Sequence, residues 1–172
     1  MFNGPERELS SQSRGATGQT VDVLLVCSTG GHLLQMHLLR DAWRDFSTAW
    51  VTFDKSDARS LLAGERVFYA YGPTNRNIPN LFRNLVLAAA VLRRTRPRVI
   101  VSTGAGLAVP FAWIGRLLGA EIVYVESVTR IDEPSLSLRL IRPVVSRIYA
   151  QWPDLASRMR RATYVGSVFD SP

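Results

Sequence analysis

The feature that most constrains the fold of this chain is the regular alternation of short apolar runs with amphipathic segments. Runs rich in Val and Ile predict buried strands, and the segments between them repeat apolar residues at helical spacing. This alternation is typical of a parallel sheet with helices on both faces. We therefore predict an α/β fold with a single Rossmann-like sheet of seven strands and six helical links. Strands are expected at residues 21–28, 48–53, 67–71, 98–102, 122–125, 148–150 and 164–165, and helices before residue 43 and at 56–64, 80–95, 104–118, 136–142 and 154–161.

Length and composition indicate one globular domain. The chain has 172 residues, of which 47% are hydrophobic and 20% charged. Residues 1–20 are polar and are predicted to form a disordered tail, so that the domain covers residues 21–172. The longest apolar run is short, whereas a membrane-spanning helix needs about 20 apolar residues, and we expect none. Cys27 is the only cysteine, which excludes an intrachain disulfide framework.

The net charge of +7 comes almost entirely from arginine, since Lys55 is the only lysine. Arginine binds phosphate oxygens in a bidentate manner, so this bias suits a polyanionic partner or an anionic membrane surface. The codon bias of a GC-rich genome explains the composition equally well. We predict membrane contact for the helix at 80–95, with the alternative that its leucines belong to the core. The apolar side chains concerned are Leu81, Phe82, Leu85 and Leu92, and the basic ones are Arg83, Arg93 and Arg94.

A glycine turn with a histidine follows the first predicted strand. Its residues are Ser28, Thr29, Gly30, Gly31 and His32. Backbone N–H groups at such a turn, together with the positive end of the following helix, attract anions. We predict that the first four residues bind phosphate and that His32 acts as a general base or a phosphate donor. The alternative is that His32 only caps the helix.

Two further polar turns are expected at the same edge of the sheet. Gly104 and Gly106 follow the strand at 98–102, while Glu126, Ser127 and Arg130 follow the strand at 122–125. Residues just beyond the carboxyl ends of parallel strands line the ligand crevice of such folds. Burial of an unpaired carboxylate is costly, so we expect Glu126 either to face the crevice or to pair with Arg130.

Two other classes of site are weighed against this crevice. Gly104 and Gly106, with Glu126 about 20 residues later, partly match a dinucleotide-binding turn, but Val109 stands at the third glycine position. Binding of NAD by the isolated chain would identify such an enzyme. With two histidines and one cysteine, no metal site is expected. We predict no cofactor and no nucleic-acid partner.

Taken in order, five segments resemble the acceptor-side subunit of split glycosyltransferases. They are the Gly-Gly-His turn at 30–32, Ser-Thr-Gly-Ala-Gly at 102–106, Val-Glu-Ser at 125–127 followed by Arg130, Leu-Ser-Leu at 136–138 and Gln-Trp-Pro-Asp-Leu at 151–155. The family includes a subunit of the UDP-N-acetylglucosamine transferase of dolichol-linked oligosaccharide assembly. Its bacterial members, including the PssD type, serve capsule and exopolysaccharide synthesis. The resemblance covers residues 21–168.

This resemblance implies one Rossmann-like half of a GT-B glycosyltransferase, similar to the N-terminal half of MurG. A separate subunit would bind the UDP-sugar, and this chain would bind a polyprenyl- or dolichyl-diphosphate-linked acceptor. His32 or Glu126 would then be the catalytic base, and transfer would require both subunits. Alternatively, the chain is a non-catalytic scaffold. The implied acceptor- and phosphate-binding residues are Ser28, Thr29, Gly30, Gly31, Arg76, Gly104, Gly106, Ser127 and Arg130.

Location and partner contacts complete the expectations. Eukaryotic members carry an N-terminal membrane anchor, whereas this chain begins with a polar tail. We therefore expect a peripheral protein on the cytoplasmic face of the membrane. A lone GT-B half leaves a cleft open for its partner, and aromatic residues anchor interfaces. Trp152, Tyr164 and Phe169 are the predicted interface residues, with core packing of Trp152 as the alternative.

Overall fold

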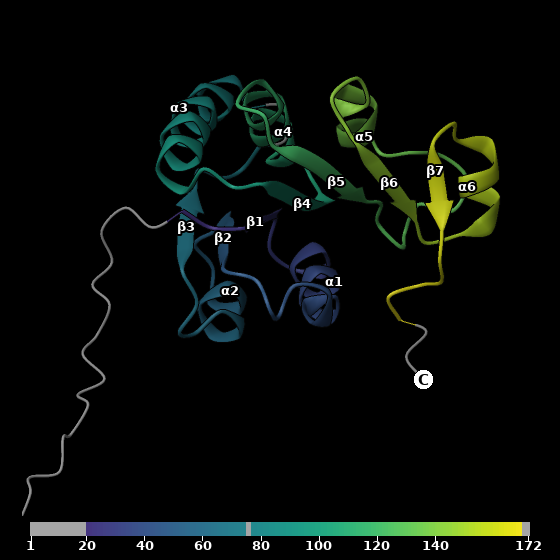
Figure 1. Ribbon diagram of the computed structural model, residues 1–172, viewed down its shortest axis with the longest axis horizontal. Helices are drawn as coiled ribbons and strands as arrows, with labels where there is room; N and C mark the ends of the chain where they lie inside the picture. Colours follow the sequence, from purple (N-terminus) through teal and green to yellow (C-terminus); the bar gives the residue numbers. More distant parts are fainter. Residues whose placement is uncertain (1–19, 75–76, 170–172) are drawn as a thin grey trace, which may run out of the picture.

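The computed structural model describes residues 20–74 and 77–169, which form a seven-stranded sheet with helices on both faces (Figure 1). All neighbouring strands pair in parallel, in the order β3-β2-β1-β4-β5-β6-β7. The predicted Rossmann-like α/β fold is therefore confirmed. The strands are β1 Val23–Cys27, β2 Thr48–Phe53, β3 Val67–Ala70, β4 Val99–Gly104, β5 Glu121–Val125, β6 Arg147–Ala150 and β7 Ala162–Tyr164.

The helices cover the two faces of the sheet unequally. One face carries α3, α4 and α5, which lie above the sheet in Figure 1, whereas α1 and α2 lie below its β1–β4 part and α6 lies beside β7. Among the described residues, no helix lies under β5 and β6 on the lower face, and the C-terminal segment descends there. The helices are α1 Gly31–Leu38, the 3₁₀ helix η1 Arg40–Ala42, α2 Ser56–Leu61, α3 Ile78–Thr95, α4 Ala108–Leu117, α5 Leu136–Ile141 and α6 Pro153–Arg158.

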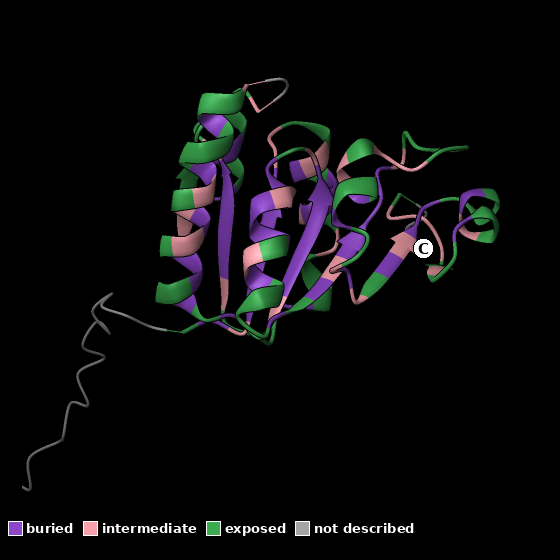
Figure 2. Ribbon diagram, turned by 90° about the horizontal axis from the view of Figure 1, so that it is seen from above, coloured by how far each residue is buried: buried purple, intermediate pink, exposed green. Residues whose placement is uncertain are grey.

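Alternate residues of the central strands feed two separate cores. In β1, Leu24 and Val26 pack beneath α3, α4 and α5, while Leu25 and Cys27 pack toward α1 and α2. This is the two-residue period of a strand that is buried on both faces. Figure 2 shows the central strands buried along most of their length, with exposed segments on the outer turns of the helices and on loops. The apolar run at residues 21–28 thus contains β1, a strand in the middle of the sheet.

Several element ends differ from the sequence-based prediction. Helix α3 begins at Ile78, two residues early, because the Asn77 side chain accepts a hydrogen bond from the Asn80 amide and Pro79 fits the first turn of a helix. Helix α4 begins only at Ala108, since Gly104 and Ala105 adopt positive φ angles of 120° and 68° that no helix contains. The last strand begins two residues earlier and ends one residue earlier than expected.

The strand order creates a switch point between β1 and β4. From β1 the chain proceeds outward to β2 and β3, then returns to β4 on the other side of β1 and continues to β7. At such a point the loops that follow the two central strands diverge, and ligands bind between them. We call the edge where the strands end the carboxyl edge and the opposite one the amino edge.

Candidate functional site

The carboxyl edges of β1 and β4 bring the two predicted glycine turns together. Cys27 at the end of β1 lies in register with Gly104 at the end of β4. The turn at residues 28–30 and the turn at 104–107 therefore flank the switch point. Cys27 itself is fully buried, and burial raises the pKa of its thiol to about 12. A thiol with so high a pKa is no nucleophile near neutral pH, so the chemistry of this edge falls to other residues.

His32 is held by two hydrogen bonds to the same residue of β4. Its Nδ1 lies 2.7 Å from the Thr103 carbonyl oxygen, and the Thr103 hydroxyl donates to the His32 carbonyl over 2.8 Å. A carbonyl oxygen only accepts, so Nδ1 carries the proton and Nε2 of the neutral ring keeps its lone pair. The half-buried imidazole is thus fixed in the tautomer that a general base requires.

Gly104 is the point of closest approach in this cluster. A Cβ at this position would lie 2.9 Å from the Tyr124 hydroxyl and 3.0 Å from His32 Cε1, in a backbone with φ +120°. Both observations require glycine here. Burial, with the charge of Glu126 as a further cause, raises the pKa of Tyr124, so its hydroxyl stays protonated beside the histidine. The structure therefore joins Gly104 and His32, as predicted, and adds Tyr124, which sequence inspection treated only as a strand residue.

Glu126 does not face the crevice as expected. The residue is fully buried, and its two carboxylate oxygens accept hydrogen bonds from the backbone amides of Ser127, at 2.9 Å, and Ser135, at 2.8 Å. Ser135 in turn contacts the Tyr124 hydroxyl at 3.1 Å. The burial cost is therefore offset by backbone amides rather than by the crevice or by Arg130.

The geometry of Glu126 also bears on the dinucleotide alternative. An acid that binds ribose must present free carboxylate oxygens to the ligand. Both oxygens of Glu126 hold the loop from Ser127 to Ser135 closed. In addition, Gln35 of α1 donates from Nε2 to the Glu126 carbonyl over 2.9 Å. Glu126 therefore connects the loop after β5 to α1 through hydrogen bonds. Its carboxylate is not available to bind a ribose, which argues against the dinucleotide alternative.

The glycine turn already contains an anion from the protein itself. The Gly30 amide donates to the Asp57 carboxylate, in the first turn of α2, over 2.7 Å. This contact contradicts the expectation that the Gly30 amide is open to a ligand phosphate. Sequence reasoning missed Asp57 because it lies 27 residues away and reads as an ordinary acidic residue at a helix start. The contact shows that the turn can bind a carboxylate, and the Gly30 amide is already hydrogen-bonded to Asp57.

The remaining predicted binding residues lie around the same edge. A Cβ at Gly106 would approach the Thr74 hydroxyl to 3.3 Å, so the β3–α3 loop packs on the β4 turn. Arg76 lies outside the described residues. The Ser127 hydroxyl contacts that of Thr129 at 3.0 Å, and the exposed Arg130 donates its amide to the Ser127 carbonyl over 2.9 Å. The binding roles of these residues stay predictions.

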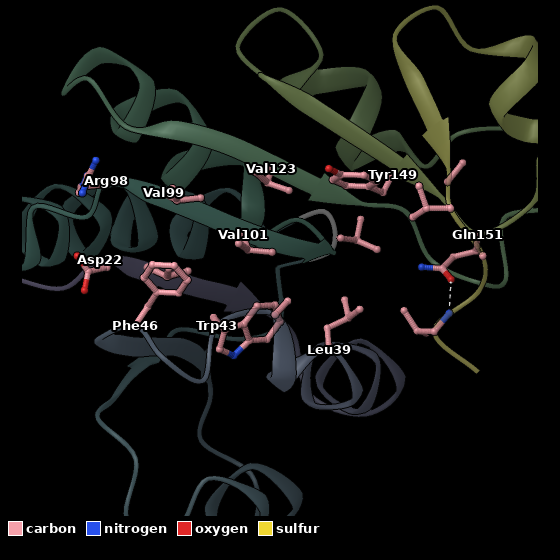
Figure 3. Close-up of a pocket in the computed structure, with 17 residues that line it drawn as sticks. Asp22, Leu39, Trp43, Phe46, Arg98, Val99, Val101, Val123, Tyr149 and Gln151 are labelled. Atoms are coloured by element: carbon pink, nitrogen blue, oxygen red, sulfur yellow. Dashed lines mark hydrogen bonds between the residues drawn. The ribbon is translucent and has the colours of Figure 1, made fainter. Parts of the chain in front are cut away.

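An apolar trough lies on the face of the sheet that α1 and α2 leave open (Figure 3). It encloses about 760 Å³. The Gln151 side chain accepts a hydrogen bond from the Val168 amide over 2.9 Å and so fixes the C-terminal segment along one side. We call this feature the sheet trough. Its floor is Val99, Val101, Val123, Val125 and Tyr149, one wall is Trp43 and Phe46, and the other is Val165 and Val168.

The predicted interface residues lie near the trough but outside it. Tyr164 and Phe169 are exposed neighbours of the wall formed by Val165 and Val168. The Trp152 indole donates to the Val128 carbonyl over 2.6 Å, and the residue remains 37% exposed. Trp152 therefore belongs neither to the core nor to the trough lining. The assignment of these three residues to a partner interface stays a prediction.

Helix α3 is only partly available for membrane contact. Phe82 and Leu81 are exposed as predicted, but Leu92 is 1% exposed and packs in the core. The prediction is therefore wrong for Leu92, because α3 turns that side toward the sheet. The most exposed apolar residues, Ile78 and Val86, were not named in the prediction. Within the described residues, no helix has both the length and the apolar character needed to cross a bilayer.

Comparison with known sequences identifies a family to which this chain is similar. The family described as "Oligosaccharide biosynthesis protein Alg14 like" matches residues 66–168. The UDP-N-acetylglucosamine transferase subunit ALG14 of Eremothecium gossypii is 30% identical over 188 residues, covering 91% of this chain and 84% of that protein. The corresponding Schizosaccharomyces pombe subunit is 44% identical over 77 residues, covering 42% of this chain. That match spans only 37% of the fission yeast protein.

Solved structures show the same fold at low sequence identity. MurG of Acinetobacter baumannii superposes with a TM-score of 0.67 at 12% identity, over 85% of this chain and 45% of MurG. A UDP-GlcNAc 2-epimerase from Methanocaldococcus jannaschii gives a TM-score of 0.65 at 14% identity, again over 45% of that chain. The likeness to less than half of each protein confirms the predicted Rossmann-like half of a GT-B fold. By the extent of the family match and of the Eremothecium alignment, the chain belongs to the Alg14 family of oligosaccharide biosynthesis proteins.

Proposed function

We propose that this chain is the acceptor-binding subunit of a two-component glycosyltransferase. A donor-binding partner would supply the UDP-sugar, and the pair would transfer a hexose or N-acetylhexosamine to a lipid-diphosphate-linked acceptor. The relatives named as UDP-N-acetylglucosamine transferase subunits support the reaction class. The single observation that carries the proposal is the open sheet trough on a fold that matches less than half of MurG. For a bacterial chain, a PssD-type place in capsule or exopolysaccharide synthesis belongs to the same proposal.

The sheet trough supports the recruitment of a partner. An apolar sheet face is stable when another element covers it, and large uncovered apolar patches mark interaction sites. Val99 and Val123 are half-buried and line such a face between two walls, next to the buried Val101. We infer that an apolar segment of the donor-binding partner lies in the trough. Tyr164 and Phe169, next to one wall, are the aromatic residues proposed to anchor it.

His32 is the proposed general base. In the transfer, the acceptor hydroxyl would give its proton to His32 Nε2 while its oxygen attacks the anomeric carbon of the donor. The bond from that carbon to the phosphate oxygen would break, and UDP would leave with the electron pair. The Thr103 carbonyl, 2.7 Å from Nδ1, would stabilise the imidazolium that forms. This orientation of the ring supports His32 over Glu126 as the base.

Glu126 is proposed to act as a positioning residue. Its hydrogen bonds fix the loop that carries Ser127 and Arg130 at the carboxyl edge. The loop would then present a hydroxyl and a guanidinium to the acceptor diphosphate. On the facing side, Ser28, Thr29 and Gly31 would contribute donors. Access of phosphate to the Gly30 amide would require displacement of Asp57.

Peripheral membrane contact is the remaining part of the proposal. Every charged residue within α3, α4 and α5 is an arginine, and α3 exposes Ile78, Phe82 and Val86 on its outer side. A surface of apolar and basic side chains suits the interface of an anionic membrane. We propose that this helical layer faces the cytoplasmic leaflet, from which a lipid-linked acceptor would reach the carboxyl edge.

Reconstitution tests the proposed function. The full chain is coexpressed with a donor-binding Rossmann-like subunit from the same genome and incubated with radiolabelled UDP-N-acetylglucosamine and a polyprenyl-diphosphate-linked acceptor. We expect label in the lipid fraction only when both subunits are present. Tight binding of UDP-sugar by the isolated chain would contradict the division of roles. A complex that keeps full activity with His32→Ala would identify the chain as a scaffold.

A further inference from the structure

Three arginines surround a second, small pocket at the amino edge of the sheet. Arg142 follows α5, and Arg160 and Arg161 form the turn between α6 and β7. The pocket measures about 200 Å³, and its remaining lining is Val145, Ser146 and Ile148. We call it the arginine pocket. Because the strands are parallel, it lies at the edge of the sheet opposite to His32.

The guanidinium groups of this pocket have no acidic partner among residues 20–74 and 77–169. Two acids of the loop before α5 are already engaged, since Glu133 pairs with Arg139 at 2.6 Å and Asp132 with Arg158 at 3.4 Å. No ion pair of the described residues includes Arg142, Arg160 or Arg161. Like charges gathered around one pocket repel each other, and an anion relieves that repulsion.

The rest of the lining favours an oxyanion over a simple counterion. The Ser146 hydroxyl accepts a hydrogen bond from the Ile122 amide over 3.2 Å and keeps its own proton to donate. Guanidinium groups present planar pairs of N–H donors that match the oxygen spacing of phosphate. Val145 and Ile148 belong to the core beneath α3, α4 and α5, so the pocket lies on that face of the sheet.

We propose that the arginine pocket binds a phosphate group, independently of the proposed site at His32. The phosphate is either a free ion or diphosphate, or the headgroup of an anionic phospholipid at the proposed membrane-facing layer. The chemistry of recognition is the same for both sources. This site does not depend on the transfer reaction, so it can be tested on the full chain without a partner subunit.

Titration of the full chain with inorganic phosphate and pyrophosphate, followed by amide NMR at low salt, tests the site. We expect saturable shifts at Ser146, Arg161 and Ala162. Arg142→Gln with Arg160→Gln should weaken binding by about tenfold or more. Arg40→Gln with Arg44→Gln removes the same charge from the other face and should leave binding unchanged. Arg161→Gly is a second variant, because glycine accepts the φ of +73° found there.

Vesicles separate the two sources of phosphate. The same variants are sedimented with phosphatidylcholine vesicles that contain or lack phosphatidylglycerol. If the pocket variant loses both phosphate binding and binding to anionic vesicles, the ligand is a lipid headgroup. Loss of phosphate binding alone identifies a free phosphate or diphosphate. The proposal is overturned if shifts are absent, appear only around Gly31 and His32, or are equally reduced by the pocket and control pairs.

Discussion

The two faces of the sheet differ in what covers them. On one face, α3, α4 and α5 bury alternate residues of the central strands, including Ile122 of β5. On the other, α1 and α2 cover β1–β4 and leave part of the sheet open, and the next residue of β5, Val123, lines the sheet trough. In β5, Ile122 is therefore part of a buried core, whereas its neighbour Val123 lines the sheet trough on the opposite face. The two buried cores stabilise the fold, and the open part of the second face supports the proposal that the chain is one half of an enzyme.

The largest expected effect compares these two neighbours directly. Ile122→Asp places a carboxylate in a fully buried apolar position, which should cost more than about 4 kcal/mol of unfolding free energy and prevent folding. Val123→Asp places the same charge in the open trough and should cost about 1 kcal/mol. Urea unfolding followed by circular dichroism measures both. Equal destabilisation would mean that the trough is not open in solution.

The second prediction concerns the proposed base His32 at the carboxyl edge, where the two faces of the sheet meet. In the reconstituted complex, His32→Ala should lower turnover by about 10²–10⁴, since it removes the proposed proton acceptor. His37→Ala changes a histidine one turn later in the same helix and should leave turnover nearly unchanged. The assay is transfer of label from UDP-N-acetylglucosamine, with binding of the partner as a control. Equal rates for the two variants would remove His32 from the mechanism.

The third prediction concerns membrane binding by the exposed basic residues of α3. Changing Arg83, Arg93 and Arg94 to Ser should weaken binding to anionic vesicles by about two orders of magnitude, because each basic residue near such a surface contributes about 1 kcal/mol. The effect should fade at high salt. Changing three basic residues of the other face, Arg40, Arg44 and Lys55, to Ser is the matched control. Sedimentation that depends equally on both sets would assign the binding to net charge alone.

Glu126 gives the smallest expected effect. Glu126→Gln replaces one acceptor oxygen by a donor, so that one of the amides of Ser127 and Ser135 loses its partner. We expect a loss of about 1–3 kcal/mol in the unfolding free energy. Glu121→Gln, at the exposed start of the same strand, should have almost no effect. If the Glu126→Gln variant is as stable as the original chain but inactive in the complex, Glu126 acts in catalysis rather than in positioning.

The sequence sufficed for the fold because local patterns determine its elements. Val and Ile runs, helical spacing and glycine turns located seven strands and six helices with errors of a few residues at their ends. The sequence also predicted that His32 and Gly104 lie together at the carboxyl edge, since parallel strands end at the same edge of a sheet. The open trough could not be predicted in detail, because Val99, Val101 and Val123 would have the same apolar character under a helix.

The details of the site depended on contacts between distant residues. Asp57 reaches Gly30 across 27 positions, and Glu126 reaches Ser135 across 9. Nothing in the local pattern distinguishes an acid that binds a ligand from one that binds a backbone amide. The wrong prediction of membrane contact for Leu92 has a different cause. The prediction assigned the apolar residues of α3 to the membrane without first determining which side of the helix faces the sheet.

The affinity of the chain for its donor-binding partner tests the central claim most directly. We propose that the sheet trough is the docking surface for this partner. Val123→Asp should lower this affinity by at least about 100-fold, because an unpaired carboxylate would be buried at the interface, while circular dichroism shows a folded protein. Leu140→Asp introduces the same charge at an exposed site on the covered face and should bind the partner normally. If Val123→Asp binds the partner as tightly as the original chain, the trough is not the docking surface and the account is wrong.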